Sequence, residues 1–332
     1  MLTAQRHLPV MADRVVELLR PHPGGVYLDA TLGLGGHSER ILQASAPGGR
    51  VVGLDRDPEA VALARERLAW AGERLVGVGA SFAELAEVAA DLGVERVDGV
   101  LYDLGVSSLQ LDEPERGFSY RVDAPLDMRM DPGGGITAAD VLATYPRAEL
   151  TRVFRVYGEE RFASRIARFV DDARRRAPIR TTGELVDLVK AAIPAAARRT
   201  GPHPARRVFQ ALRIEVNGEL TALADSLPQA IDLLAPGGRV VALSYHSLED
   251  RIVKRTFVAA ATGREEGYPH PAPAVPPGGA QGQAPLTPRI AILTRRPETP
   301  GPDEVAANPR AESAKLRAAE KLQPSDPAGG QP

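Results

Sequence analysis

Cysteine is absent from this chain of 332 residues. Its absence excludes disulfides, cysteine-ligated zinc, iron–sulfur clusters and a catalytic thiolate. A net charge is nearly absent as well, because 41 Lys and Arg oppose 43 Asp and Glu and leave −2. No overall field therefore draws the molecule to nucleic acid or to a membrane, and any such attraction has to be local.

Long apolar runs are also missing, although 43% of the residues are hydrophobic. No stretch approaches the roughly 18 apolar residues of a membrane helix. Charged side chains interrupt residues 1–16, which argues against a signal peptide there. We therefore expect a globular, cytoplasmic protein without a membrane partner.

Short apolar strands alternate with helical patterns in the first third of the chain. Strands are predicted at 26–28, 50–55, 74–79 and 97–103, and helices at 10–20, 38–42, 58–70 and 82–92. This alternation predicts a parallel sheet covered by helices, in which ligands bind beyond the carboxyl ends of the strands. Asp29, Asp55 and Asp103 all lie at such ends, so we expect them to share a site.

The pattern changes after Asp103. Residues 104–135 are loop-like, and helices are predicted at 138–144, 149–157, 162–176 and 182–193. A helix over 207–234, a strand over 239–245 and a helix over 247–260 then resume the sheet pattern. We therefore predict a sheet domain formed by 1–108 and 207–322, with a helical domain inserted at 109–206.

The end of the chain is less regular. Residues 269–288 are rich in proline and glycine and are expected to form a flexible loop, and 323–332 a disordered tail. Residues 289–295 and 313–321 fit a closing antiparallel hairpin. A helix from Ser313 fits equally well.

A glycine-rich turn follows the first predicted strand, with the spacing Asp29-x-Thr31-x-Gly33-x-Gly35-Gly36. Such glycines let the backbone approach a ligand and leave helix N-terminal amides free for it. The spacing is not G-x-G-x-x-G, because Thr31 stands where the first glycine would be. A tight turn that binds nothing would have the same pattern.

Two carboxylates and an aromatic residue narrow the choice of ligand. Asp55, at the end of the second strand, is placed to accept hydrogen bonds from both hydroxyls of a ribose. Asp29 beside the turn suits an amino group and repels phosphate, which favours S-adenosylmethionine over a dinucleotide. Phe82, after the third strand, fits either a cover for the adenine or a core position.

Ten segments in order along the chain carry a family resemblance. They are 29–38, 55–58, 102–108, 112–119, 125–131, 157–162, 203–205, 209–217, 244–254 and 307–310. From His7 to about Lys321, apart from the proline-rich loop, the chain resembles the bacterial small-subunit ribosomal RNA (cytosine-N4)-methyltransferases, the MraW/RsmH family. It departs from the family pattern at Leu109, where proline is usual, and at Tyr245, where phenylalanine is usual.

The resemblance implies an α/β fold, a Rossmann-like S-adenosylmethionine-dependent methyltransferase sheet with an inserted all-helical domain. It also implies methylation of the exocyclic N4 amine of a cytidine in 16S rRNA of the small ribosomal subunit. The family's cofactor contacts correspond to Gly35, Gly36, His37, Asp55, Phe82, Asp103 and Gln110. The turn pattern adds Asp29 and Gly33 to the cofactor candidates.

A cytosine amine is a weak nucleophile, so methyl transfer needs in-line placement and an acceptor for the amine proton. No covalent enzyme adduct is required, which agrees with the missing cysteines and argues against methylation at C5. Asp103 is one candidate acceptor, although the family uses it for the cofactor. His246 is the other, and it could equally be a loop anchor.

Substrate binding is expected in the insertion. Residues 147–207 contain fourteen Arg and one Lys against seven Asp and Glu, and the rest of the chain is net acidic. This segregation fits contacts to RNA phosphates, although arginine-rich helices can also be solvated faces. Phe118, Tyr120 and Met128 in the loop 112–131 fit either stacking on an extruded base or core packing.

Three other functions compete with this interpretation. An NAD-linked oxidoreductase would use the same fold, but it lacks support because G-x-G-x-x-G is absent. A non-catalytic ribosome-assembly factor would keep the fold alone. A DNA amino-methylase is disfavoured by Asp103-Leu-Gly-Val-Ser107, which lacks the expected Pro-Pro-Tyr. No metal site is predicted, and the oligomeric state stays open, with a homodimer as one possibility.

Overall fold

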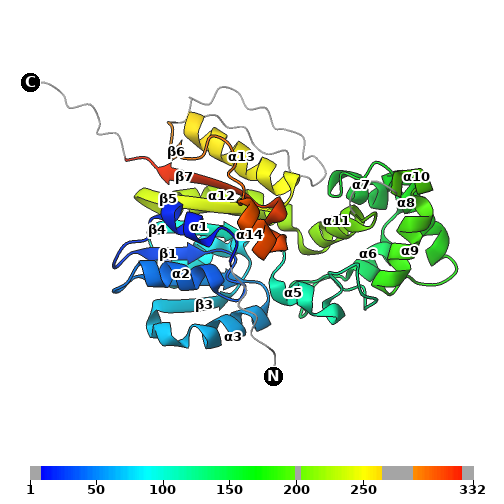
Figure 1. Ribbon diagram of the computed structural model, residues 1–332, viewed down its shortest axis with the longest axis horizontal. Coiled ribbons are helices and arrows are strands. Elements are labelled where there is room, and N and C mark those ends of the chain that lie inside the picture. Colours follow the sequence, from blue (N-terminus) through cyan, green and yellow to red (C-terminus); the bar gives the residue numbers. More distant parts are fainter. Residues whose placement is uncertain (1–8, 199–202, 264–286, 324–332) are drawn as a thin grey trace, which may run out of the picture. The chain divides into compact units, whose positions relative to one another are not determined.

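The computed structural model describes residues 9–198, 203–263 and 287–323. The described residues within 1–105 and 220–332 form one compact unit, and those within 106–219 form another (Figure 1). We call them the sheet unit and the helical unit. The helical unit therefore extends to Glu219, beyond the expected end at residue 206. The predicted loop 269–288 lies, apart from its last two residues, outside the described residues, and so does the tail after 323.

The sheet unit contains a seven-stranded sheet in the order β3-β2-β1-β4-β5-β7-β6 (Figure 1). The strands are β1 Val26–Asp29, β2 Arg50–Asp55, β3 Leu75–Gly79, β4 Val97–Asp103, β5 Leu234–Ser244, β6 Ile290–Ile292 and β7 Lys315–Lys321. The first five are parallel, and β7 runs antiparallel to both β5 and β6. The predicted α/β sheet with a helical insertion is confirmed.

Helices connect these strands. They are α1 Ala12–Leu19, α2 Gly36–Ala44, α3 Pro58–Arg67, α4 Leu85–Asp91, α12 Glu219–Leu233, α13 Ser247–Thr262 and α14 Pro302–Ala307, with 3-10 turns at 69–74, 82–84 and 309–313. The central strand β4 is buried along nearly its whole length, as expected of a parallel strand covered on both faces. One core cluster joins Leu19 of α1, Ile41 of α2, Leu243 of β5 and Leu316 of β7.

The antiparallel hairpin at the end of the chain is confirmed, and the alternative helix from Ser313 is wrong. β7 pairs along β5, with Leu316 opposite Leu243 and Ala318 opposite Val241. These residues join the core cluster, so the strand is stabilised by partners that lie about 70 residues earlier. A local pattern does not contain that information.

The single helix predicted over 207–234 is also wrong. The chain forms α11 Arg206–Asn217 and α12 Glu219–Leu233, and Gly218 separates them in the left-handed region at φ 61°. Glycine adopts this conformation without the clash of a Cβ, so it ends α11. The boundary between the two units also falls here.

The helical unit contains, besides α11, four helices and two short ones among its described residues. They are α5 Ser108–Asp112, α6 Ala138–Thr144, α7 Arg147–Val156, α8 Ala163–Arg174, α9 Thr182–Ala192 and α10 Ala195–Arg198, with a 3-10 turn at 114–116. Leu150, Phe154, Ile166 and Leu212 are fully buried between them. The helix α5 lies within the segment that was predicted to be loop.

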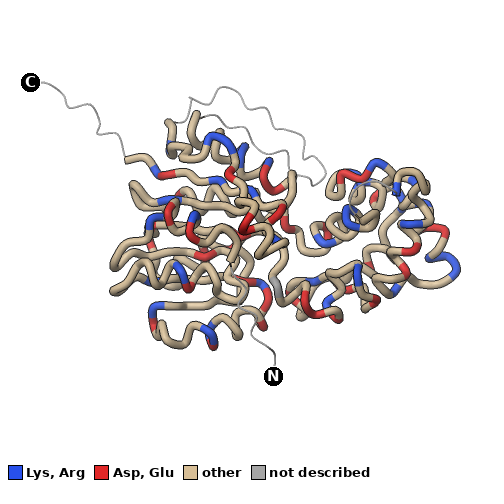
Figure 2. The backbone as a smooth tube through the Cα atoms, viewed as in Figure 1, with Lys and Arg blue, Asp and Glu red and all other residues tan. Residues whose placement is uncertain are grey.

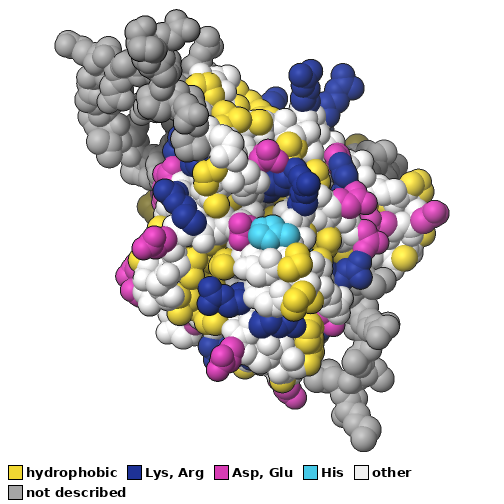
Figure 3. Space-filling view, turned by 90° about the vertical axis from the view of Figure 1, so that its left-hand side faces the viewer, with side chains coloured by type: hydrophobic (Ala, Val, Ile, Leu, Met, Phe, Trp, Pro, Cys, Tyr) yellow, Lys and Arg dark blue, Asp and Glu magenta, His cyan; other side chains and the backbone are white. Residues whose placement is uncertain are grey.

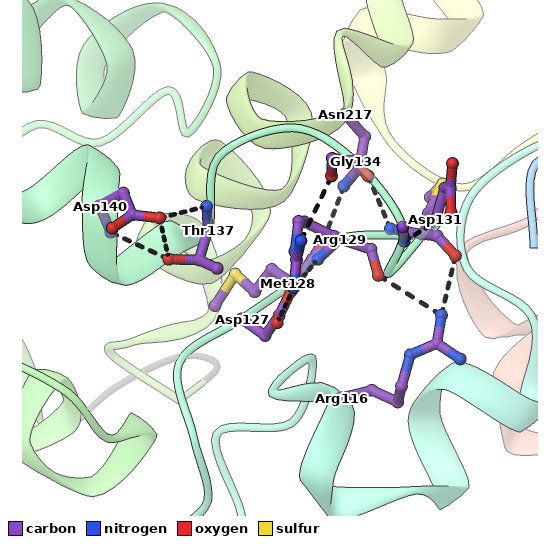
Figure 4. A network of polar contacts seen from close by, with 11 residues as sticks. Arg116, Asp127, Met128, Arg129, Asp131, Gly134, Thr137, Asp140 and Asn217 are labelled. Carbon is purple, nitrogen blue, oxygen red and sulfur yellow. Dashed lines mark hydrogen bonds and ion pairs between the residues drawn. The ribbon is translucent and has the colours of Figure 1, made fainter.

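Polar contacts hold the loop of the helical unit that includes residues 127–134 (Figure 4). Asn217 accepts a hydrogen bond from the Met130 amide and donates one to the Met128 carbonyl, both at 2.8 Å. Arg129 makes two bonds of 2.8 Å to Asp127, and Arg116 donates to the Met130 carbonyl. Met128 is fully buried and Phe118 is 7% exposed. Both side chains therefore belong to the core rather than to a stacking surface.

Candidate cofactor and active site

Asp29 ends β1 and is completely buried. Its carboxylate accepts hydrogen bonds from the Ser38 hydroxyl of α2 at 2.7 Å and from the Thr31 amide at 3.2 Å. Burial raises its pKa, and these hydrogen bonds oppose the rise. Asp29 therefore fixes the glycine turn to the start of α2. Ser38 has no signal in the sequence that would mark it for this role.

Asp55 ends β2 and reaches the same turn. Its two carboxylate oxygens accept hydrogen bonds from the Gly33 amide at 2.8 Å and from the Asp57 amide at 2.9 Å. Burial raises the pKa of Asp55 to about 6, against the effect of both amides. A carboxylate oxygen has two lone pairs, so each oxygen can still accept a second hydrogen bond. Asp55 is thus in direct contact with the glycine turn.

Backbone conformation and close packing both require glycine at positions of this turn. Gly33 and Gly35 have φ of 49° and 77°, in the left-handed region that favours glycine. A Cβ on Gly35 would come within 2.8 Å of a Leu68 methyl carbon, and one on Gly36 within 3.3 Å of Pro9. The turn is therefore seated against Leu68 and Pro9, which the spacing of the glycines does not reveal.

Asp103, at the end of β4, lies at the centre of the cluster. One carboxylate oxygen accepts a hydrogen bond from the Tyr245 hydroxyl at 2.6 Å, and the other lies 3.4 Å from His37 Nε2. Its backbone amide donates to the Thr31 hydroxyl at 2.6 Å. The side chain is 27% exposed, so the carboxylate is oriented from both sides and remains accessible.

His37 and Tyr245 both contact Asp103, and burial shifts their pKa values in opposite directions. Burial lowers the pKa of His37, but the carboxylates of Asp103, Asp29 and Glu304 outweigh it, so that the pKa is raised overall. Within the described residues, neither ring nitrogen of His37 has a well-aligned hydrogen bond. Burial raises the pKa of Tyr245 well above 10, and its phenol stays protonated as a donor. Tyr245 had appeared in the sequence only as a departure from a family pattern.

His246 is built into the start of α13. It is the N-cap residue, and its Nδ1 accepts a hydrogen bond from the Glu249 amide at 3.4 Å. Its Nε2 lies 3.0 Å from the Glu249 carboxylate, which in turn accepts a bond from the Tyr245 amide at 2.8 Å. The ring is only 10% exposed. This geometry is that of a loop anchor, one of the two roles expected for His246.

Phe82 and Gln110 complete the predicted set. Phe82 packs edge-on against Tyr102, with ring centroids 5.9 Å apart, and it is partly exposed. Gln110 belongs to the helical unit, is 3% exposed and accepts a hydrogen bond from the Ser107 amide at 3.1 Å. The structure thus brings together seven of the predicted cofactor residues in the sheet unit, namely Asp29, Gly33, Gly35, Gly36, His37, Asp55 and Asp103.

The described ranges contain no group of three or more His, Asp or Glu side chains arranged to hold a metal ion. They also contain no helix that is long and apolar enough to cross a membrane.

The sheet order and the site define the class of the protein. A sheet of five parallel strands followed by the antiparallel β7 inserted beside β5 is typical of S-adenosylmethionine-dependent methyltransferases, and it differs from the all-parallel sheet of dinucleotide enzymes. Acidic residues end β1, β2 and β4 around a glycine turn at one edge of this sheet. The chain is a Rossmann-like S-adenosylmethionine-dependent methyltransferase.

Comparison with known proteins gives the family. The model of the MraW methylase family matches residues 4–322, so the chain belongs to this family. It is 54% identical over 321 residues to ribosomal RNA small subunit methyltransferase H of Thermobifida fusca, covering 96% of this chain and 94% of that protein. It is 56% identical over 323 residues to the protein of the same name from Frankia alni, covering 96% of each.

A solved structure adds nothing to this assignment. A putative rRNA-methylase from Clostridium thermocellum superimposes with a TM-score of 0.40 and 13% identity, covering 94% of this chain and 95% of that one. The family membership removes the NAD-linked oxidoreductase from the competing functions.

Proposed function

We propose that the protein transfers a methyl group from S-adenosylmethionine to the exocyclic N4 amine of a cytidine in 16S rRNA of the small ribosomal subunit. The curated relatives, which match nearly the whole chain, are named as small-subunit ribosomal RNA methyltransferases. The observation that carries the choice of an amine is the accessible Asp103 carboxylate, held by Tyr245 and His37 beside the glycine turn.

The cofactor residues proposed are Gly33, Gly35, Gly36, His37, Asp29, Asp55, Phe82, Asp103 and Gln110. The site fits the cofactor in two respects. Asp55 keeps free lone pairs for ribose hydroxyls, and Nδ1 of the buried His37 ring has no hydrogen-bond partner in the described chain. S-adenosylmethionine supplies an electrophilic methyl group when bound.

Asp103 is proposed to orient the amine and to take its proton. The carboxylate accepts a hydrogen bond from the N4–H, which directs the nitrogen lone pair away from that bond. With bound S-adenosylmethionine supplying the methyl group, Asp103 would take the proton that N4 loses as the new N–C bond forms. Tyr245 and His37 act as positioning residues, because each contacts one oxygen of the carboxylate. His246 remains the second proposed acceptor, but its contacts with Glu249 support an anchoring role.

A direct assay tests this function. Small subunits from a strain lacking the enzyme are incubated with the protein and methyl-labelled S-adenosylmethionine, and the labelled nucleoside is identified. We expect N4-methylcytidine in 16S rRNA. Label in DNA or small molecules with none in rRNA would overturn the proposal, and binding of subunits without transfer would favour the assembly factor.

The remaining expectations follow from this substrate. We propose that residues 109–206 bind the RNA and that the enzyme works in the cytoplasm, where subunits are assembled. A homodimer stays a prediction, which analytical ultracentrifugation of the purified protein would check.

A further inference from the structure

Several arginines in the helical unit form ion pairs or hydrogen bonds that stabilise the fold. Arg174 bonds Asp171 at 2.8 Å and donates to the carbonyls of Leu142 and Tyr145. Arg175 pairs with the other oxygen of Asp171 at 2.8 Å. Arg152 pairs with Glu149 at 2.7 Å. These guanidinium groups neutralise acids or satisfy helix ends, so they explain only part of the local positive charge visible in Figure 2.

Three arginines at the start of α8 differ from these. Arg161, Arg165 and Arg168 are exposed and, among the described residues, have no carboxylate within ion-pair distance. Their guanidinium groups lie over phenylalanine rings instead. Arg161 lies 4.7 Å from the centroid of Phe162, and Arg165 and Arg168 lie 5.8 and 5.6 Å from that of Phe169.

The sequence spacing places two of these arginines on one face of α8. Arg165 and Arg168, three residues apart within α8, lie on the same side of the helix, and Arg161 comes just before its N-cap residue Phe162. Phe162 and Phe169, seven residues apart, flank them and are only partly buried. Asp172 lies on the same side of α8, so this side carries two positive side chains and one negative side chain. We call Arg161, Phe162, Arg165, Arg168 and Phe169 the α8 stripe.

A guanidinium stacked on an aromatic ring is held in place with its N–H edge directed outward. Such an edge suits the two oxygens of a phosphate, and a partly exposed ring suits a nucleobase. Combined cations and aromatic rings are typical of surfaces that bind single-stranded nucleic acid, because paired bases offer no face for stacking. On the side of the molecule seen in Figure 3, by contrast, basic and acidic side chains are interspersed.

We propose that the α8 stripe binds a single-stranded segment of the substrate RNA, the arginines contacting phosphates and the phenylalanines stacking on bases. The proposal rests on the proposed function only for the identity of the polymer. RNA binding can be measured without methyl transfer, so the two can fail separately.

The test uses the full chain and a fluorescein-labelled single-stranded RNA of mixed sequence, with binding followed by anisotropy at several salt concentrations. Each phosphate contact to a single strand contributes about 0.7 to the slope of log K against log salt. We expect Arg165→Ala to reduce the slope by about 0.7 and the triple Arg161, Arg165, Arg168→Ala variant by about 2. Phe169→Leu should weaken binding about tenfold with an unchanged slope.

Arg175→Ala is the matched control, because Arg175 caps the same helix, is 72% exposed and pairs with Asp171. It should leave the slope unchanged. S-adenosylhomocysteine binding shows that each variant is folded. Equal slopes for Arg165→Ala and Arg175→Ala would overturn the proposal. Equally tight binding of a duplex, with the same loss on Phe169→Leu, would overturn the single-strand assignment.

Discussion

At the scale of the residue, burial favours the protonated form of Asp55, whereas cofactor binding requires the ionised form. Its burial raises its pKa to about 6, so the folded protein binds a proton that the unfolded chain releases near pH 4. This group therefore makes folding less favourable as the pH rises from about 4 to 6. The ionised form is nevertheless the one that can accept hydrogen bonds from two ribose hydroxyls.

We therefore predict that cofactor affinity increases with pH through about 6. The Kd for S-adenosylhomocysteine, measured by calorimetry between pH 5 and 8, should be several-fold higher at pH 5 than at pH 7. Asp55→Asn should bind weakly throughout and lose the dependence. Asp98→Asn is the control, because Asp98 accepts a hydrogen bond from the Val26 amide at the opposite end of the sheet. A pH profile of Asp55→Asn identical to that of the wild type would contradict this role.

At the scale of the element, α13 begins at a residue that was a candidate catalyst. His246 provides its side chain to the first turn, where an N-cap contributes about 1 kcal/mol to stability. We predict that His246→Ala lowers the free energy of unfolding in urea by about 1 kcal/mol, and that His246→Asn, which retains an N-cap, loses less.

Single-turnover methyl transfer separates capping from catalysis. His246→Asn should keep the rate within about threefold of the wild type, whereas loss of a general base costs about 10²- to 10⁴-fold, the range expected for Asp103→Asn. A rate for His246→Asn as low as that of Asp103→Asn, with cofactor binding intact, would identify His246 as the proton acceptor.

The junction of α11 and α12 depends on one glycine. Gly218 has φ of 61°, and a Cβ added to it would meet nothing within 4 Å, so Gly218→Ala changes backbone strain alone. We predict a loss of about 1–2 kcal/mol in the free energy of unfolding. Gly134→Ala is the control, since Gly134 also has open space but no positive φ. Equal stability of the two variants would show that the break tolerates an L-residue.

At the scale of the whole molecule, a net charge of −2 conceals two regions of opposite sign. The segment 147–207 carries an excess of basic residues, while the sheet unit contributes the acidic ends of β1, β2 and β4. Phosphate contacts release counterions when they form, whereas binding of a small zwitterionic cofactor releases almost none.

Salt should consequently affect the two ligands differently. Between 50 and 200 mM salt, three phosphate contacts to single-stranded RNA predict a loss of affinity of about 20-fold. The Kd for S-adenosylhomocysteine should change less than about twofold over the same range. Parallel titrations of one preparation would check this, and a salt-independent affinity for RNA would contradict phosphate contacts altogether.

The sequence by itself determined the local features of this protein. The alternation of apolar strands and helices predicted the parallel strands β1 to β4, and the carboxylates at their ends predicted the cluster of Asp29, Asp55 and Asp103. These signals are local, because a few consecutive residues determine both the burial of a strand and the residue at which it ends.

Only the tertiary structure decided which groups meet. The Tyr245 hydroxyl and the His37 ring reach Asp103 because β5 and α2 lie beside β4 and β1 in the fold. The strand β7 is a strand because β5 and β6 pair with it, although its own pattern also fitted a helix. Contacts between residues distant in the chain depend on chain topology and packing, and a local pattern contains neither.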